Sequence, residues 1–301
     1  MARVGVMIEG QEGLTWELWR NLCRDVEDLE LDSLWRSEHL LSVMGGEGRE
    51  CLETWTSLAL AAEWTARIEF GPLVSPMTYR APAVLARAAA SVDQLSGGRL
   101  VLGLGAGWYE EEHRRMGIEL PPLRERMDRF EAGVKRVKEV LAAGHPTPAR
   151  QPLPIQIGGS GERRTLRIVA EHADEWNFHS ETPDTLRHKL DVLADHCSAV
   201  GRDRSTIRLS MMAAFVIGRD EGELRQRAER LRALSPRFEG LDSDALLERL
   251  RQRWYVGTPE QIAEQLRPYL DLGVERLMLQ HFLMDDRDAL ELLGNLARLI
   301  T

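Results

Sequence analysis

Short apolar segments alternate with longer amphipathic segments along the whole chain. The apolar segments have the length and character of buried strands: Arg3–Ile8, Ser33–Ser37, Ile68–Val74, Leu100–Gly105, Ile155–Gly158, Asp174–Phe178, Ile207–Ile217 and Arg276–Phe282. Strands that alternate with helices are typical of a parallel sheet with crossover helices. Eight such units favour a closed α/β fold, the (β/α)8 or TIM barrel, over an open sheet. The first strand is followed by Glu9-Gly10-Gln11-Glu12-Gly13, which lacks the GxGxxG spacing of a dinucleotide-binding fold.

The segments between the strands carry the residues that start and stop helices. Helices are expected at Trp16–Leu29, Thr54–Thr65, Pro82–Leu95 and Leu123–Ala143. Pro82 suits a first helical turn, and Gly97-Gly98 ends that helix before the next strand. Thr258-Pro259-Glu260 has the pattern of an N-cap followed by a first-turn proline and carboxylate.

One polar stretch, Asp220–Val256, is too long for one helix and a loop. Breaks at Ser235-Pro236 and Gly240 divide it into two predicted helices. They form a helical insertion between the seventh and eighth strands, at approximately residues 220–256. Nothing in the chain resembles an inter-domain linker, so residues 1–301 are expected to form a single barrel domain.

Composition narrows the range of partners. The 39 basic and 48 acidic residues give a net charge of −9, which disfavours binding to nucleic acid or to anionic membranes. No apolar run approaches the roughly 18 residues of a membrane-spanning helix, and Glu9 follows the N-terminal apolar residues too soon for a signal peptide. The three cysteines are widely spaced and form no CxxC pair, so neither a disulfide framework nor a metal site is expected. These features predict a cytoplasmic protein.

In a barrel enzyme the functional residues gather at the C-terminal ends of the strands. The second predicted strand ends in Ser37-Glu38-His39. Because adjacent strand residues point to opposite sides, one of Glu38 and His39 is expected to face the barrel mouth. A histidine titrates near neutral pH and suits proton transfer. The alternative is a hydrogen-bonded structural histidine at the rim.

Glycines follow the fourth and fifth predicted strands. Gly103–Tyr109 contains small residues that let a planar ring or a phosphate approach the backbone, although they equally suit tight helix packing. The next residues, Glu110–Glu112, are interpreted as the solvated first turn of a helix. Gly158–Gly161 opens another helix, and free N–H groups at a helix N-terminus favour an anion. Arg163 or Arg164 can add charge-assisted bonds to the same phosphate.

Three motifs occur together in a fixed order. They are Pro82–Ala86 followed by Asp93–Trp108, then Pro154–Gly161, then Ala173–Asn177. Over almost the whole chain this order resembles the luciferase-like monooxygenase superfamily, and in particular its coenzyme F420-dependent branch. The link between Ala143 and Pro154 and the loop Glu9–Leu14 are shorter than in many relatives, so analogies about the substrate do not carry over.

The resemblance implies roles for individual residues. His39 matches a histidine near the reactive face of the cofactor, and Glu38 stands where the family usually has Asp. Leu73-Val74 matches a non-prolyl cis peptide bond that supports the ring from behind. Further matches are Ala106, Gly107 and Trp108 beside the cofactor tail, Gly158, Gly159, Ser160 and Gly161 as the phosphate cradle, and Asn177 in the cavity wall.

These residues lead to one main hypothesis and two alternatives. The main hypothesis is an F420-dependent oxidoreductase that moves a hydride between deazaflavin C5 and a small hydrophobic organic substrate. In this hypothesis His39 exchanges a proton with the substrate or polarises it, and Glu38 either orients His39 or is structural. One alternative is an FMN-dependent monooxygenase that uses O2 and a partner flavin reductase; the other is a non-catalytic flavin-binding protein. Five aromatic residues suggest an apolar substrate pocket: Trp16, Trp35, Trp55, Tyr79 and Trp108. The resemblance also predicts a homodimer.

Overall fold

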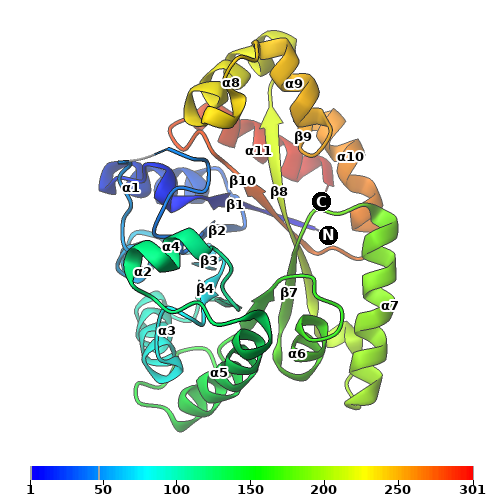
Figure 1. The fold of residues 1–301 in the computed structure, drawn as a ribbon. Coiled ribbons are helices and arrows are strands. Elements are labelled where there is room, and N and C mark those ends of the chain that lie inside the picture. Colours follow the sequence, from blue (N-terminus) through cyan, green and yellow to red (C-terminus); the bar gives the residue numbers. More distant parts are fainter. Residues whose placement is uncertain (1, 47, 301) are drawn as a thin grey trace.

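The computed structural model describes residues 2–46 and 48–300; Met1 and Thr301, the ends of the predicted domain, lie outside the described residues. The strands form the centre of the molecule and the helices surround them (Figure 1). The strands are β1 (Arg3–Ile8), β2 (Ser33–Arg36), β3 (Glu69–Pro72), β4 (Ser75–Pro76), β5 (Leu102–Gly105), β6 (Ile155–Gly158), β7 (Glu175–His179), β8 (Arg208–Ile217), β9 (Tyr255–Gly257) and β10 (Arg276–Gln280). Every pairing between them is parallel.

The sheet closes on itself as a barrel. Its order is β3-β2-β1-β10-β8-β7-β6-β5-β4, and β9 pairs only with the far end of β8. β3 lies within the predicted strand Ile68–Val74, and β4 continues it just beyond that range, after an interruption at Leu73-Val74. Counted together, β3 and β4 make one strand of the ring, which then contains the eight strands expected from the sequence. A parallel bridge between Phe70 and Leu100 completes the closure next to the β4–β5 pairing. The predicted TIM barrel is confirmed.

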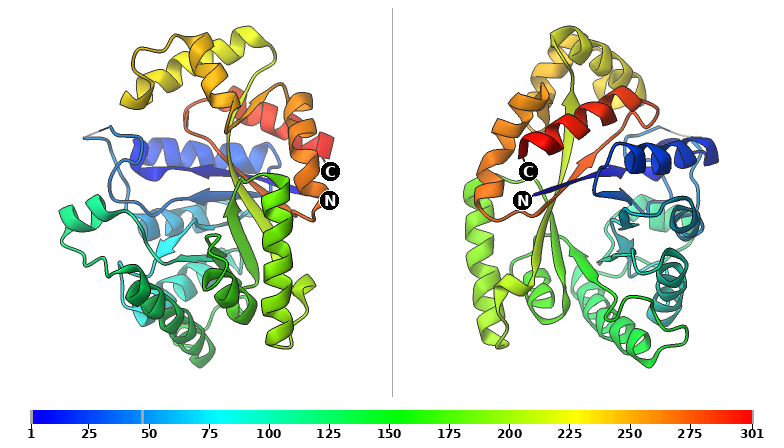
Figure 2. Two further views of the ribbon diagram at one scale, coloured as in Figure 1. Left: turned by 45° about the vertical axis from the view of Figure 1, so that its right-hand side comes forward. Right: turned by 180° about the vertical axis from the view of Figure 1, so that it is seen from behind.

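The helices cover the outside of the barrel (Figure 2). They are α1 (Trp16–Asp28), α2 (Thr54–Trp64), α3 (Pro82–Ser96), α5 (Leu123–Ala143), α6 (Thr165–His172), α7 (Pro183–Ala199), α10 (Pro259–Asp271) and α11 (Arg287–Ile300). Outward-facing strand residues such as Val4, Val6 and Ile8 are buried with them in one apolar cluster. The residues predicted to end α3 and to begin α10 do so. Gly97, after α3, has a left-handed φ of 69°, and Thr258 and Gln261 form a capping box at the start of α10.

Two further helices, α8 (Glu221–Leu234) and α9 (Ser243–Arg251), lie between β8 and β10 in the chain, within the range predicted for an insertion. In Figure 1 they lie at the far end of the long strand β8. They bury a separate apolar cluster that includes Leu224, Leu246 and Phe282. Met44, from the loop after β2, belongs to this cluster, so the loop that begins at His39 is anchored to these helices.

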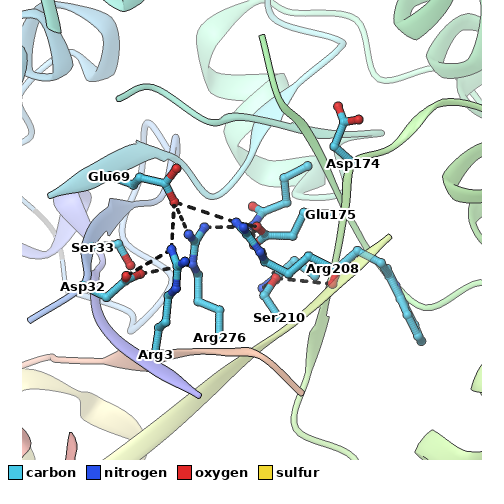
Figure 3. Close-up of polar contacts among 12 residues, drawn as sticks. Arg3, Asp32, Ser33, Glu69, Asp174, Glu175, Arg208, Ser210 and Arg276 are labelled. Atoms are coloured by element: carbon cyan, nitrogen blue, oxygen red, sulfur yellow. Dashed lines mark hydrogen bonds and ion pairs between the residues drawn. The ribbon is translucent and has the colours of Figure 1, made fainter. Parts of the chain in front are cut away.

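The N-terminal end of the barrel interior is filled by charged side chains (Figure 3). Arg276 is fully buried; its Nη1 lies 3.0 Å from Glu175 Oε2, its Nε lies 3.3 Å from Asp32 Oδ2, and it also pairs with Glu69. Burial opposes ionisation of Glu69, but the charge of Arg276 holds the pKa of this carboxyl group below its usual value. This cluster closes the end of the barrel opposite the mouth.

Candidate active site

Strand alternation determines which side chains reach the barrel mouth. Met7 and Trp35 face the interior, so Glu9 and Ser37, two residues further along each strand, face it as well. The carboxylate of Glu9 accepts hydrogen bonds from Gln11 Nε2 at 2.7 Å and from the side chain of Gln280. Ser37 Oγ donates to Gln11 Oε1 at 2.6 Å. The members of this polar group come from three separate segments, so local sequence patterns do not predict their contacts with one another.

Val74 and two glycines form part of the floor of the mouth. The peptide bond between Leu73 and Val74 is cis, as the resemblance implied. A Cβ atom at Gly105 would lie 2.5 Å from Val74 Cγ2, and one at Gly158 would lie 3.0 Å from Val74 Cγ1. Glycine at both positions therefore makes room for the Val74 side chain, which packs against their backbone.

His39 stands at the rim of this mouth. Its Nδ1 atom lies 3.1 Å from Glu112 Oε1 and 3.2 Å from Oε2, and 16 % of its side chain remains exposed. No described residue bonds to its Nε2 atom. Burial lowers the pKa of His39, but the hydrogen bond and the charge of Glu112 outweigh this effect, so the pKa lies above its ordinary value.

Glu38 points away from His39. Its buried carboxylate pairs with Arg80 and accepts a hydrogen bond from Ser75 Oγ. Burial raises the pKa of this carboxyl group, although Arg80 and Ser75 oppose the rise. The expectation that Glu38 orients His39 is wrong. Strand alternation directs the two side chains to opposite sides of the strand, and Glu112 lies beside the His39 ring instead.

Glu112 belongs to the acidic run Glu110–Glu112, for which the sequence predicted the solvated first turn of a helix. The run begins α4 (Glu110–Met116), in which Glu110 is exposed and Glu111 pairs with Arg114 and Arg115 at the surface. Only 1 % of the Glu112 side chain is exposed. The interpretation is therefore wrong for this third residue. Within the sequence, nothing distinguishes it from its two neighbours.

The segment after β5 places aromatic rings beside His39. Gly107 has a left-handed φ of 81°, and a Cβ atom there would lie 2.7 Å from Thr78 Oγ1. Trp108 is 62 % exposed. Its ring stacks on Tyr109 at 5.1 Å and meets the His39 ring edge-on at 5.4 Å. An exposed indole at this position offers an apolar surface to a molecule held next to His39.

The expected aromatic pocket is smaller than predicted. Trp35 is fully buried in the barrel interior, and Trp55 is buried in the core between the barrel and its helices. Trp16 lies at the start of α1, where it is 41 % exposed. Tyr79 hydrogen-bonds to Glu112, so Tyr79 and Trp108 are the members of this set that lie near His39.

Gly158–Gly161 forms a loop anchored to β7. The N–H of Gly159 donates to the carbonyl of Asn177 at 3.0 Å, and the Gly159 carbonyl accepts from Trp176 Nε1 at 2.7 Å. The backbone N–H groups of Ser160 and Gly161 have no hydrogen-bond acceptor among residues 2–46 and 48–300. They are available to an anion in front of α6.

The two arginines after this loop differ in their surroundings. Arg164 Nη1 lies 2.7 Å from Asp128 Oδ1 and also donates to the carbonyl of Arg124. Arg163 is exposed and pairs with no acidic side chain in the described part of the chain. Of the two candidates, Arg163 is therefore the one with a free guanidinium group.

Asn177 faces the barrel interior beneath the mouth. Its Nδ2 atom donates to Ser210 Oγ at 3.1 Å and lies 3.3 Å from Met278 Sδ. The side chain is buried inside the barrel. Two residues later, His179 continues the same face at the end of β7.

Among residues 2–46 and 48–300, no group of three or more His, Cys, Asp or Glu side chains is arranged to hold a metal ion. No helix in this part of the chain is long and apolar enough to span a membrane. Cys23, Cys51 and Cys197 are free thiols.

Comparison with known proteins identifies the family. Residues 1–276 match the model of the luciferase-like monooxygenases, so the chain belongs to this family. Among curated proteins, the chain is 26 % identical over 295 residues to the F420-dependent glucose-6-phosphate dehydrogenase of Amycolatopsis mediterranei, with 84 % of each chain covered. It is also 28 % identical over 239 residues to the F420-dependent hydroxymycolic acid dehydrogenase of Mycobacterium tuberculosis, covering 74 % of this chain and 65 % of the relative.

Solved structures agree on the fold. An F420-dependent secondary alcohol dehydrogenase in complex with an F420-acetone adduct superposes with a TM-score of 0.82 at 14 % identity, covering 100 % of this chain and 99 % of that one. The monooxygenase RslO1 from Streptomyces bottropensis superposes with a TM-score of 0.79 at 17 % identity, covering 97 % and 98 %. The predicted resemblance to an oxidoreductase family is confirmed.

Proposed function

We propose that this protein is a coenzyme F420-dependent oxidoreductase that transfers a hydride between deazaflavin C5 and a carbon atom of a small organic substrate. The observation that carries the proposal is His39 at the C-terminal end of β2, beside the exposed ring of Trp108, with an Nε2 atom that bonds to no described residue. F420-dependent dehydrogenases among the relatives support the choice of cofactor.

The residues of the mouth fit a deazaflavin with a phosphate-bearing tail. The Val74 side chain, for which Gly105 and Gly158 make room, offers an apolar surface that suits the flat ring. The N–H groups of Ser160 and Gly161 and the guanidinium group of Arg163 suit the phosphate. The bound deazaflavin supplies the hydride chemistry, while the protein supplies position and electrostatics.

In this proposal His39 is the catalytic residue that exchanges a proton with the substrate. When a substrate hydroxyl group is oxidised to a carbonyl group, its proton passes to His39 Nε2; on reduction, the proton returns to the oxygen. The raised pKa of His39 suits this role because the imidazolium form is stabilised once the proton has arrived. The exposed ring of Trp108 is proposed to contact the apolar carbon skeleton of the substrate.

Cofactor titration tests the proposal. We expect F420 to bind with a micromolar dissociation constant or tighter, measured by the quenching of its fluorescence. Arg163→Ala is expected to weaken this binding, whereas Arg136→Ala, on the outer helix α5, serves as the matched control. Binding of FMN in place of F420 at micromolar concentrations would overturn the assignment and favour the monooxygenase alternative with its partner reductase.

The remaining expectations stay predictions. They are a single domain, a homodimer, a cytoplasmic location and a small-molecule substrate without nucleic-acid or membrane partners. Analytical ultracentrifugation of the purified protein tests the homodimer.

A further inference from the structure

Glu112 receives hydrogen bonds from four neighbouring groups. Its Oε2 accepts from the backbone N–H of Leu40 at 2.5 Å and of Leu41 at 3.3 Å. Its Oε1 accepts from the hydroxyl group of Tyr79. His39 Nδ1 lies within hydrogen-bond distance of both oxygens. Since the side chain is 1 % exposed, these protein groups are its surroundings in place of water.

These contacts determine where the hydrogen of His39 lies. Backbone N–H groups only donate, and burial together with the charge of Glu112 raises the pKa of Tyr79, so its hydroxyl group keeps its proton. Burial raises the pKa of Glu112, but the bonds from His39 and Tyr79 outweigh this effect and keep the pKa below its usual value. The ionised carboxylate accepts at every contact, and His39 Nδ1 must donate. A neutral imidazole with its hydrogen on Nδ1 has a lone pair on Nε2.

We propose that Glu112 is the positioning residue that fixes His39 in the tautomer with the hydrogen on Nδ1, which leaves Nε2 at the barrel mouth ready to take a proton. The consequence for turnover rests on the proposed function. The assignment of the tautomer does not rest on the proposed function, since it follows from contacts within the protein.

Other charged groups face His39 without touching Nδ1. Glu9 and Glu12, in the segment after β1, add negative charge that raises the pKa of His39. Glu12 is itself paired with Arg49. The thiol of Cys51 contacts the carbonyl of His39 rather than its ring. A change at Glu112 therefore removes the bond to Nδ1 and leaves this second group of charges in place.

The variant Glu112→Gln gives the sharpest prediction. The two backbone N–H groups of Leu40 and Leu41 require an acceptor, so the amide oxygen takes the place of Oε2. The amide NH2 group then takes the place of Oε1, where it faces His39 Nδ1. An N–H donor at this position requires a lone pair on Nδ1. The hydrogen of the neutral ring then moves to Nε2, which is the wrong tautomer for accepting a proton.

NMR spectroscopy of protein labelled with ¹⁵N-histidine tests the proposal without any cofactor. In the wild-type protein we expect neutral His39 to carry its hydrogen on Nδ1. In Glu112→Gln we expect the hydrogen on Nε2, a lowered pKa of His39, and a loss of turnover of about 100-fold or more with F420 binding retained. Glu112→Asp, which keeps the carboxylate, is expected to keep the wild-type tautomer. Glu110→Gln, an exposed residue of the same helix, is the matched control and is expected to change neither property.

Two results would overturn the proposal: a hydrogen on Nε2 of neutral His39 in the wild-type protein, or an unchanged tautomer in folded Glu112→Gln. The wild-type spectrum decides the question even where the glutamine variant does not fold. A protein that shows the expected tautomer but binds no F420 would confirm the role of Glu112 and overturn the proposed function instead.

Discussion

The side chain of Val74 occupies the space that a Cβ atom at Gly105 would need, since the two would be 2.5 Å apart. Gly105→Ala is therefore expected to lower the free energy of unfolding by about 1–3 kcal/mol and to weaken F420 binding, because the floor of the mouth must shift. Chemical denaturation and fluorescence titration measure the two effects. Gly158→Ala, with a distance of 3.0 Å, is expected to cost less.

The double variant Val74→Ala/Gly105→Ala is the control for this prediction. Removing the two Cγ methyl groups of Val74 makes room for the new Cβ atom. We expect Gly105→Ala to cost less stability in the Val74→Ala background than in the wild-type protein. Equal costs in both backgrounds would show that Val74 is not the reason for glycine at position 105.

Replacing His39 tests the proposed chemistry. His39→Ala is expected to reduce turnover by about 10²–10⁴-fold, because it removes the group that exchanges the substrate proton. F420 binding is expected to change little, since no contact to the phosphate cradle is lost. Steady-state kinetics and fluorescence titration separate the two effects. Unchanged turnover in this variant would remove His39 from the mechanism.

The buried side chain of His281 is expected to lower the free energy of unfolding at acidic pH. The ring is buried against Phe215 at 5.8 Å, and its Nε2 atom has no hydrogen-bond partner among the described residues. Burial lowers the pKa of His281 from 6.5 to about 4. As the pH falls from 6.5 toward 4, the unfolded chain binds a proton that the folded protein excludes. The folded state is therefore expected to lose about 3 kcal/mol over this range.

Urea denaturation at pH 7 and pH 5 measures this loss. In His281→Gln the contribution of this ring is absent, so the difference in stability between the two pH values is expected to be smaller than in the wild-type protein. His188→Gln is the control, since the side chain of His188 is 62 % exposed. An equal pH dependence in wild type and His281→Gln would contradict the prediction.

Arg276 is expected to be the most sensitive residue of the buried charge cluster. Arg276→Ala leaves Glu175 and Asp32 without the guanidinium group that neutralises them, at a cost of about 3–5 kcal/mol. Arg3→Ala is the matched control from the same cluster. Its side chain is 52 % exposed, so about 1 kcal/mol or less is expected. Denaturation of both variants at pH 7 gives the comparison.

The sequence by itself determined the barrel and the general position of the site. Eight apolar segments alternating with amphipathic ones specify a parallel closed sheet, because strands buried on both faces must be apolar along their whole length. The observed strands match these segments closely, apart from the interruption at Leu73-Val74 and the short strands β4 and β9, which lie outside the predicted segments. Since the C-terminal ends of the strands meet at one mouth, the places of His39 and Gly158–Gly161 in the chain predicted that they lie at this mouth.

Only the tertiary structure decided which acidic side chain hydrogen-bonds to His39. Glu38 is adjacent in sequence, yet strand alternation turns it toward Arg80. Glu112 is 73 residues away and resembles its exposed neighbours in sequence, yet α4 places it against Nδ1 of the ring. Local sequence patterns report which side of a strand or helix a residue occupies. They do not report which distant segment packs against that side, and this packing sets the hydrogen-bond partners, and thereby the proton chemistry, of a buried carboxylate.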